Sequence, residues 1–179
     1  MRRNIFRDKV VIVTGASSGI GRATALEFAR NGSKVVLAAR SAERLAELEG
    51  EIRSMGAEAL SCVTDVSVEA DCRNLIEKTV YKFGTIHILI NNAGISMRAL
   101  FSDVDIAVLK RLMDVNFWGT VYCTRYALPY IVSNRGSIVG VSSTAGFHGL
   151  PGRTGYSASK FAIHGFLETV RIENLREKL

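Results

Sequence analysis

A tyrosine and a lysine stand four residues apart at Tyr156 and Lys160, within the segment Tyr-Ser-Ala-Ser-Lys. On a helix, this spacing places both side chains on one face. A phenol titrates at a pH of about 10, so a solitary tyrosine is a poor acid-base catalyst at neutral pH. A fixed positive charge beside it stabilises the phenolate and makes proton transfer accessible. The same pair occurs on ordinary helices with a solvated lysine and a packed tyrosine, so other residues must decide between the two interpretations.

Two further features lie at the ends of apolar segments. Ser143, thirteen residues before Tyr156, follows the segment 136–142 and has Ser142 as its neighbour. Near the start of the chain, a β-branched run at 10–13 leads into a Gly-x-x-x-Gly-x-Gly turn at 15–21. A buried strand followed by a glycine turn and a helix presents unpaired N–H groups and a positive helix end to a pyrophosphate. Such a turn can also merely connect a strand to a helix.

Together these motifs resemble the classical short-chain dehydrogenase/reductase family. The matching segments are 14–21 (Thr-Gly-Ala-Ser-Ser-Gly-Ile-Gly), 91–94 (Asn-Asn-Ala-Gly), Asn116, Ser143, and Tyr156 with Lys160. They occur in the family's order across nearly the whole chain. The resemblance implies a doubly wound (Rossmann) α/β fold with a parallel sheet and helices on both faces. It also implies reversible hydride transfer between a nicotinamide coenzyme and a carbonyl/secondary alcohol pair.

The resemblance assigns roles to the catalytic candidates. Tyr156 is the acid and base, Ser143 donates a hydrogen bond to the substrate oxygen, and Ser142 is the fallback for that role. Lys160 supports Tyr156 and binds the nicotinamide ribose. Asn116 holds a water that links the lysine to solvent, although a buried asparagine can instead satisfy a neighbouring backbone carbonyl.

The resemblance also places a set of residues against the coenzyme. They are Gly15, Ser17, Ser18, Gly19, Ile20, Gly21, Arg40, Asp65, Val66, Asn92, Ala93, Gly94, Tyr156 and Lys160. Asp65 either accepts a hydrogen bond from the adenine or serves only as a local turn or N-cap residue. Asn91 and Gly94 are expected near the ligand, in a turn whose role is mostly structural.

The end of the second apolar run, 34–39, bears on the choice of coenzyme. NAD-binding proteins place an acid there for the ribose 2′-OH, whereas NADP-binding proteins leave it out and supply an arginine. Alignment with the family puts Ala39 at the acidic position, and Arg40 follows it. The sequence therefore predicts NADP(H) as the preferred coenzyme, with NAD(H) as the second choice. Alternatively, Arg40 is a solvated loop charge, and Ser18 stands where some NADP-binding members carry a basic residue.

The elements that must position these residues follow from hydrophobic periodicity and glycine stops. We expect strands at 10–13, 34–39, 57–63, 86–90 and 136–142, and helices at 22–31, 41–55, 67–83, 103–130 and from about 154 toward 179. Strands that alternate with helices predict a parallel sheet with right-handed crossovers. We therefore expect residues 1–179 to form one nucleotide-binding domain.

Composition narrows the functional classes. The net charge is +6 without a run of like charges, so a nucleic-acid surface is not expected. Cys62, Cys72 and Cys123 lack the spacing of a zinc site or a disulfide framework, so we expect reduced cysteines in a cytosolic protein and no metal. The apolar run 10–13 is too short for a membrane span or a signal peptide.

The resemblance also sets expectations beyond the motifs. Family members continue with two further strands, so we expect residues 1–179 to be truncated at the C-terminus. A non-catalytic nucleotide-binding or interaction fragment of the same fold is therefore the alternative function. Residues 97–101, Phe147 and Leu150 suggest an apolar carbonyl or alcohol substrate, aliphatic, steroid-like or acyl. The helices at about 105–130 and 154–179 pair between subunits in the family, which implies a homodimer or homotetramer.

Overall fold

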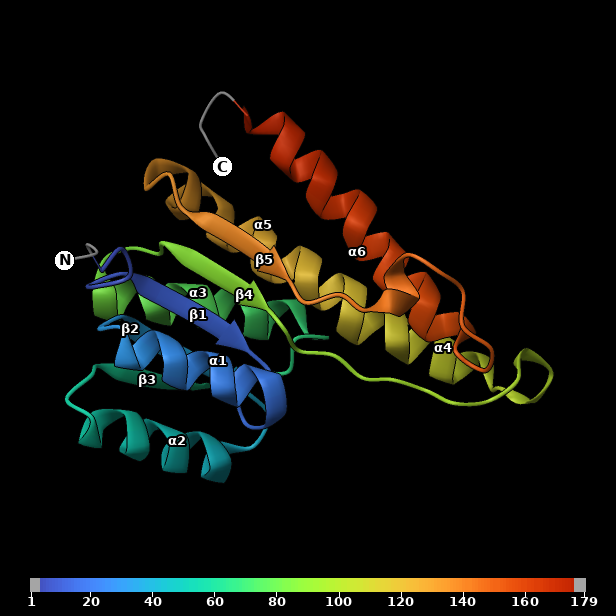
Figure 1. The fold of residues 1–179 in the computed structure, drawn as a ribbon, viewed down its shortest axis with the longest axis horizontal. Coiled ribbons are helices and arrows are strands. Elements are labelled where there is room, and N and C mark those ends of the chain that lie inside the picture. Colours follow the sequence, from blue (N-terminus) through green and yellow to red (C-terminus); the bar gives the residue numbers. More distant parts are fainter. Residues whose placement is uncertain (1–3, 176–179) are drawn as a thin grey trace.

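The computed structural model describes residues 4–175, and these form a parallel sheet of five strands with helices on both faces (Figure 1). The strands are β1 (Val10–Thr14), β2 (Lys34–Ala39), β3 (Ala59–Val63), β4 (Ile88–Asn91) and β5 (Ser137–Gly140). Their order across the sheet is β3-β2-β1-β4-β5, and all four pairings are parallel. The chain reverses its direction of progress between β1 and β4, which is the position where ligands bind in open α/β sheets.

The central strand β1 explains how the core divides into two layers. Its five residues are all buried, and successive side chains point to opposite faces. Val11 and Val13 pack into a cluster with the helices α1 (Gly19–Arg30) and α2 (Ala42–Ser54). Val10 and Ile12 pack into a second cluster with α3 (Glu69–Phe83) and α5 (Gly119–Ser133). The continuous apolar run therefore fits a strand that is covered on both sides.

The prediction of a single helix over 103–130 is wrong in detail. The structure has a short 3-10 turn η1 (Phe101–Asp103), the helix α4 (Ile106–Leu112), a π-helical segment η2 (Met113–Trp118) and then α5. A π segment inserts extra backbone into a helix and is often found at functional sites. Asn116 lies within it. Sequence periodicity does not reveal such a change of helix type, because the helical axis continues through it.

The other boundaries shift by a few residues. The first helix begins at Gly19 and not at Arg22, so the last two glycines of the turn belong to its first turn. The strand expected over 136–142 is limited to 137–140, and a 3-10 turn η3 (Thr144–Gly146) follows it. The last helix, α6, spans Thr154–Glu173. The final residues of the helix expected toward 179 lie outside the described range.

The strand β5 lies at one edge of the sheet, and alternate residues along it are exposed. The helix α6 lies beside it and packs against α4, η2 and η3 (Figure 1). Between residues 4 and 175, no helix is both long enough and apolar enough to cross a membrane. The same residues contain no group of three potential metal ligands.

Candidate active site

The glycine turn after β1 forms a tight cradle at the start of α1. Gly15 has a φ of +66°, a left-handed conformation that favours glycine. A Cβ at Gly21 would lie 2.3 Å from the carbonyl oxygen of Gly15, so only glycine fits there. The first turn of α1 holds no acidic residue, and the N-cap residue Ser18 makes no side-chain capping bond. The free N–H groups and positive end of this helix can therefore receive an anionic group.

A cavity of about 710 Å³ opens in front of this cradle. It is lined by residues from the ends of β1, β2, β3 and β4, namely Gly15, Ser17, Ser18, Gly19, Ile20, Ala38, Ala39, Arg40, Ser41, Arg44, Thr64, Asp65, Val66, Asn92, Ala93, Gly94, Ile95, Arg111 and Val115. Every residue predicted to bind the coenzyme lines this cavity except Gly21, Tyr156 and Lys160. Gly21 instead packs behind the turn. A cavity of this size and shape suits an extended dinucleotide.

The turn 91–94 is joined to the end of β1. The Thr14 hydroxyl accepts hydrogen bonds from the backbone N–H groups of Asn92 and Ala93, each at 3.0 Å. The Asn92 amide donates to the Thr14 carbonyl oxygen at 2.9 Å. Asn91 is buried and its amide donates to the Thr124 hydroxyl. These bonds fix the cavity wall and explain why two asparagines follow a buried strand.

Sequence reasoning missed Arg44 and Arg111, two arginines that line the cavity. Ser41 caps α2 by accepting a hydrogen bond from the Arg44 N–H, which places Arg44 in the first turn of that helix, beside Arg40. Asp65 is the only acidic residue among the lining residues. The wall at the end of β2 is therefore cationic. The position of Arg44 in the first helical turn after the Ser41 N-cap is the signal that could have identified this second arginine near the end of β2.

The Asp65 carboxylate is engaged by neighbours. It accepts hydrogen bonds from the backbone N–H and the hydroxyl of Ser67, at 3.0 and 2.6 Å, and from Arg111 at 3.4 Å. Burial by itself raises the pKa of Asp65, but the Ser67 hydrogen bonds and the Arg111 charge outweigh it and hold the pKa below its usual value. Asp65 therefore closes a local turn and also lies on the cavity wall.

Tyr156 and Lys160 lie on the same face of α6, as their spacing predicts. The Lys160 Nζ is 5.7 Å from the centroid of the Tyr156 ring, and the lysine is 5% exposed. Its ammonium donates a hydrogen bond to the Val141 carbonyl oxygen at 2.8 Å. Burial lowers the pKa of Lys160. A methyl group at Gly94 would lie 3.6 Å from Lys160 Nζ, so the lysine reaches the edge of the glycine-lined cavity.

Asn116 is fully buried and its amide is fully used. Its Oδ1 accepts from the Ile95 N–H at 2.8 Å, and its Nδ2 donates to the Ile95 carbonyl oxygen at 3.0 Å and to the Ser159 hydroxyl at 2.9 Å. Ser159 in turn donates to the Tyr156 carbonyl oxygen. The side chain of Asn116 therefore joins the segment after β4 to the helix that carries the tyrosine. The bonds to Ile95 fit the alternative of a buried asparagine that satisfies backbone groups, and the water-linked role of Asn116 stays a prediction.

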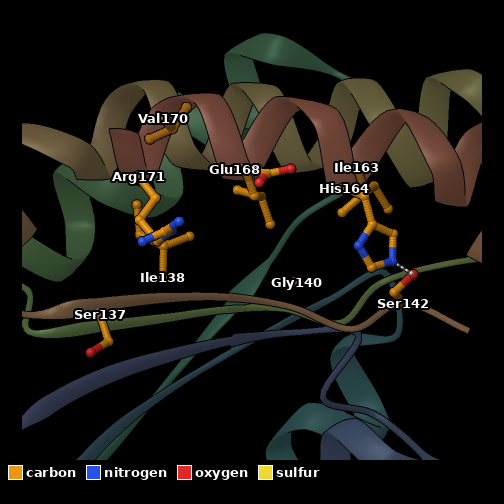
Figure 2. Close-up of a pocket in the computed structure, with 10 residues that line it drawn as sticks. Ser137, Ile138, Gly140, Ser142, Ile163, His164, Glu168, Val170 and Arg171 are labelled. Atoms are coloured by element: carbon orange, nitrogen blue, oxygen red, sulfur yellow. Dashed lines mark hydrogen bonds between the residues drawn. The ribbon is translucent and has the colours of Figure 1, made fainter. Parts of the chain in front are cut away.

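The two serines after β5 have different partners. The Ser142 hydroxyl is bonded to His164 Nε2 at 2.8 Å, in a hollow of about 420 Å³ between β5 and α6 (Figure 2). The Ser143 hydroxyl accepts a hydrogen bond from the Ala145 N–H at 3.2 Å. Ser143 is thereby the N-cap of η3, which packs on α6. The Ser143 hydroxyl thus acts as an acceptor in this bond, whereas the Ser142 hydroxyl is engaged by His164.

Comparisons with known proteins agree with this geometry. A sequence model described as short chain dehydrogenase matches residues 9–178. The chain is 44% identical over 167 residues to 11-beta-hydroxysteroid dehydrogenase A of Sesamum indicum, which covers 92% of this chain and 48% of that protein. It is 42% identical over 167 residues to 11-beta-hydroxysteroid dehydrogenase-like 4A of Arabidopsis thaliana, covering 92% of this chain and 56% of that one. The chain thus spans about half the length of the curated relatives that it matches.

Solved structures show the same likeness. An NAD⁺-bound xylitol dehydrogenase superposes with a TM-score of 0.92 at 32% identity, over 97% of this chain and 67% of that one. A short chain dehydrogenase/reductase from Burkholderia phymatum in complex with NAD superposes with a TM-score of 0.90 at 33% identity, over 94% and 60% of the two chains. The family match covers nearly the whole chain, and the sheet, the glycine turn and the Tyr156–Lys160 helix are all in place. The chain therefore belongs to the short-chain dehydrogenase family of oxidoreductases that use a nicotinamide dinucleotide.

Proposed function

We propose that this protein is an NADP(H)-dependent oxidoreductase that interconverts a carbonyl compound and a secondary alcohol. The observation that carries the proposal is the position of Tyr156 and Lys160 beside a glycine-lined cavity whose far end holds two arginines. The nicotinamide coenzyme, when bound, supplies or accepts the hydride. The chain's own residues supply anion binding, orientation and proton transfer.

Each residue's contribution follows from its position. With the coenzyme bound, the α1 N-terminus and the glycine turn would hold its pyrophosphate, and Lys160 would hold the nicotinamide ribose. In the reduction direction Tyr156 donates its hydroxyl proton to the carbonyl oxygen, and in oxidation it accepts the proton of the alcohol. Ser143 donates a hydrogen bond to that oxygen as negative charge develops on it. Asn116 holds the tyrosine's helix in place through Ser159.

The coenzyme preference rests on the cationic end of the cavity. Ala39 stands where an acid would repel a 2′-phosphate, and Arg40 and Arg44 can bind that group with charge-assisted hydrogen bonds. We expect Arg40→Ala to weaken NADPH binding about 10- to 100-fold and to leave NADH binding nearly unchanged, since NADH lacks the phosphate. Coenzyme titrations by fluorescence measure both affinities. Equal losses for the two coenzymes would contradict the assignment.

The catalytic assignment is tested with Tyr156→Phe, which keeps the aromatic ring and removes the hydroxyl group that would donate the proton. We expect turnover with NADPH and a ketone panel to fall below detection, while the thermal stabilisation by NADPH persists. Retained turnover would refute the role of Tyr156. A wild-type protein that binds NADPH and turns over no ketone or alcohol would instead favour the non-catalytic alternative.

The substrate is proposed to be apolar. Two loops next to Tyr156 are joined by a hydrogen bond from the Ala99 N–H to the Gly152 carbonyl oxygen, and they expose Leu100, Phe101, Phe147 and Leu150. Such exposed apolar side chains suit an aliphatic or steroid-like ketone or alcohol. The named hydroxysteroid dehydrogenase relatives support the same substrate class. The preference for apolar substrates is measured as kcat/KM over a panel of ketones that differ in apolar surface area.

We also propose a homodimer or homotetramer that pairs through α4, α5 and α6. Val108 on α4, Trp118 at the end of η2 and Phe161 on α6 are each more than 40% accessible, and Trp118 stacks on Tyr122 of α5. Large apolar and aromatic side chains gathered on one surface are typical of subunit interfaces. Light scattering should show the wild type as an oligomer and Phe161→Asp as a smaller species.

A reducing, cytosolic setting is our further proposal, because all three cysteines are buried and free.

A further inference from the structure

His164 lies on α6, four residues after Lys160 and eight after Tyr156, so the three side chains follow one another along one face of the helix. This face binds the chain where it leaves β5. The Lys160 ammonium donates to the Val141 carbonyl oxygen at 2.8 Å. His164 Nε2 is hydrogen-bonded to the Ser142 hydroxyl, also at 2.8 Å (Figure 2). Successive turns of the helix therefore bind successive residues at the end of the strand.

The same histidine contacts the chain after Ser143. A Cβ at Gly146 would lie 2.6 Å from Ser142 Oγ and 3.0 Å from His164 Nε2, so the turn η3 packs directly on this hydrogen-bonded pair. The Phe147 ring lies against the imidazole, with 4.3 Å between the two ring centroids. His164 therefore touches the chain on both sides of the serine that is proposed to bind the substrate oxygen.

The hydrogen bonds that Ser143 accepts do not connect it to α6. Its hydroxyl accepts from the Ala145 N–H and its carbonyl oxygen accepts from the Gly146 N–H, so both bonds stay within η3. Among the described strands, β5 pairs only with β4, and the last bond between them starts from the Val141 N–H. Ser143 thus lies beyond the sheet, and its position relative to Tyr156 depends on contacts between its segment and α6.

We propose that His164 is a positioning residue for Ser143, which it fixes relative to Tyr156 through its bond to the preceding serine. The inference rests on the proposed function, because it assigns His164 to the serine of the proposed reaction. In this role His164 exchanges no proton with the substrate. A displacement of about 1 Å can cost about 100-fold in rate, so a group that fixes the serine contributes to the chemical step without contacting the substrate. A histidine that only stabilises the fold would make the same contacts, and the test must separate the two roles.

The test breaks the hydrogen bond in the full-length protein and then restores it. His164→Leu and Ser142→Ala each delete one partner of the bond. His164→Gln places an amide at the ε position, and this amide can donate or accept as the ring nitrogen does. Val170→Ala is the control for lost packing, because Val170 is buried on the same helix and lines the other end of the hollow (Figure 2). The two deletions are also made in a Ser143→Ala background.

We expect His164→Leu and Ser142→Ala to lower the single-turnover rate of ketone reduction by NADPH about tenfold, part of the roughly 100- to 1,000-fold that loss of such a donor costs. The ketone is the member of the panel that the wild type reduces fastest. In the Ser143→Ala background the same changes should cost about twofold or less, because the misplaced group is absent. His164→Gln should recover most of the rate, and Val170→Ala should keep it. NADPH affinity should stay at the wild-type value, since the glycine cradle lies at the end of another strand.

Hydrogen exchange tests the position of the serine without turnover. The Ala145 and Gly146 amides both donate to Ser143. His164→Leu should make these two amides exchange about five- to tenfold faster, the factor that corresponds to one net hydrogen bond. The amides of β1 should exchange as they do in the wild type.

The inference is overturned if the two amides keep their wild-type exchange rates, or if His164→Gln loses as much of the reduction rate as His164→Leu. It is also overturned if His164→Leu costs the Ser143→Ala protein as much as it costs the wild type, because the effect would then not act through the serine. A wild-type protein without dehydrogenase activity would refute the proposed function, while the exchange rates would still decide whether His164 fixes the Ser143 turn.

Discussion

The strands β1 and β5 both end at the edge of the sheet that carries the site, and they differ in how they are supported. All residues of β1 are nearly inaccessible, with helices packed on both faces and a strand on either side. The edge strand β5 has Val139 43% exposed and Ser137 exposed, and a hollow separates part of it from α6 (Figure 2). The coenzyme cradle thus follows a fully packed strand, whereas Ser143 follows a sparsely packed one.

This difference separates what local sequence determines from what long-range contacts determine. The cradle needs only a strand, three glycines and a helix start that follow one another in the chain. The proposed catalytic side needs Ser143, Tyr156 and Lys160 to be positioned through η3, the π segment and the loop after β4. Backbone conformation therefore builds the first region, and side-chain hydrogen bonds build the second.

The largest effect is expected from Gly21→Ala, in the packed region. The new Cβ would lie 2.3 Å from the Gly15 carbonyl oxygen and 2.5 Å from Asn92 Nδ2, so the turn must move. We expect a loss of about 3 kcal/mol or more in the free energy of unfolding, and loss of coenzyme binding. Urea unfolding and an NADPH titration measure the two effects.

Gly50→Ala is the matched control for this change. Gly50 lies inside α2, and a Cβ there meets no atom within 4 Å. We expect a gain of about 1 kcal/mol, because alanine has the higher helix propensity. A tolerated Gly21→Ala that still binds NADPH would show that the cradle is not built by close backbone packing.

The sequence predicted the packed region well because its signals are local. The apolar run before Gly15, the glycine spacing and the helix stops predicted the parallel α/β fold, which the structure and the family comparison confirm. The predicted spacing of Tyr156 and Lys160 also places them on one face of α6. The roles of these residues in binding and catalysis stay predictions.

What the sequence did not reveal depends on contacts between distant segments. The π segment around Asn116 was not predicted. The Asn116 side chain bonds to Ile95 and Ser159, which lie on two other parts of the chain, so the local sequence does not show these contacts. The contact between Arg153 and Ser96 was not predicted, because the two residues lie 57 positions apart in the chain. The strand 136–142 was predicted too long, since an apolar run does not show where strand pairing stops.

An intermediate effect on the free energy of unfolding is expected when one valine is replaced by alanine in β1 and another in β5. Val13→Ala removes two methyl groups from a side chain with 0% exposure, and should lower the free energy of unfolding by about 2 to 3 kcal/mol. Val139→Ala acts on a side chain that is 43% exposed, and should lower it by about 0.5 kcal/mol. Urea unfolding of the two variants measures the difference. Equal losses would show that another strand or a second subunit covers β5, and the comparison between the two strands would fail.

The smallest effect is expected at His87, which immediately precedes β4 and contacts the start of β1. Its Nδ1 accepts a hydrogen bond from the Val10 N–H at 3.1 Å, which requires a neutral ring protonated at Nε2. Burial lowers the pKa of His87, and the nearby charge of Lys9 lowers it further. The unfolded chain therefore binds the proton more tightly than the folded protein does. The stability from this group is present above the unfolded pKa of about 6.5 and is lost as the pH falls through the folded value.

His87→Gln should therefore unfold with a weaker dependence on pH than the wild type between about pH 7.5 and about pH 5.5. The difference should be about 1 kcal/mol or less, the scale of one buried hydrogen bond. Urea midpoints at the two pH values measure it. His148→Gln is the control, because His148 is exposed and should leave the wild-type dependence intact. If His87→Gln keeps that dependence, another group causes it, and the hydrogen bond from the Val10 N–H to His87 does not contribute to it.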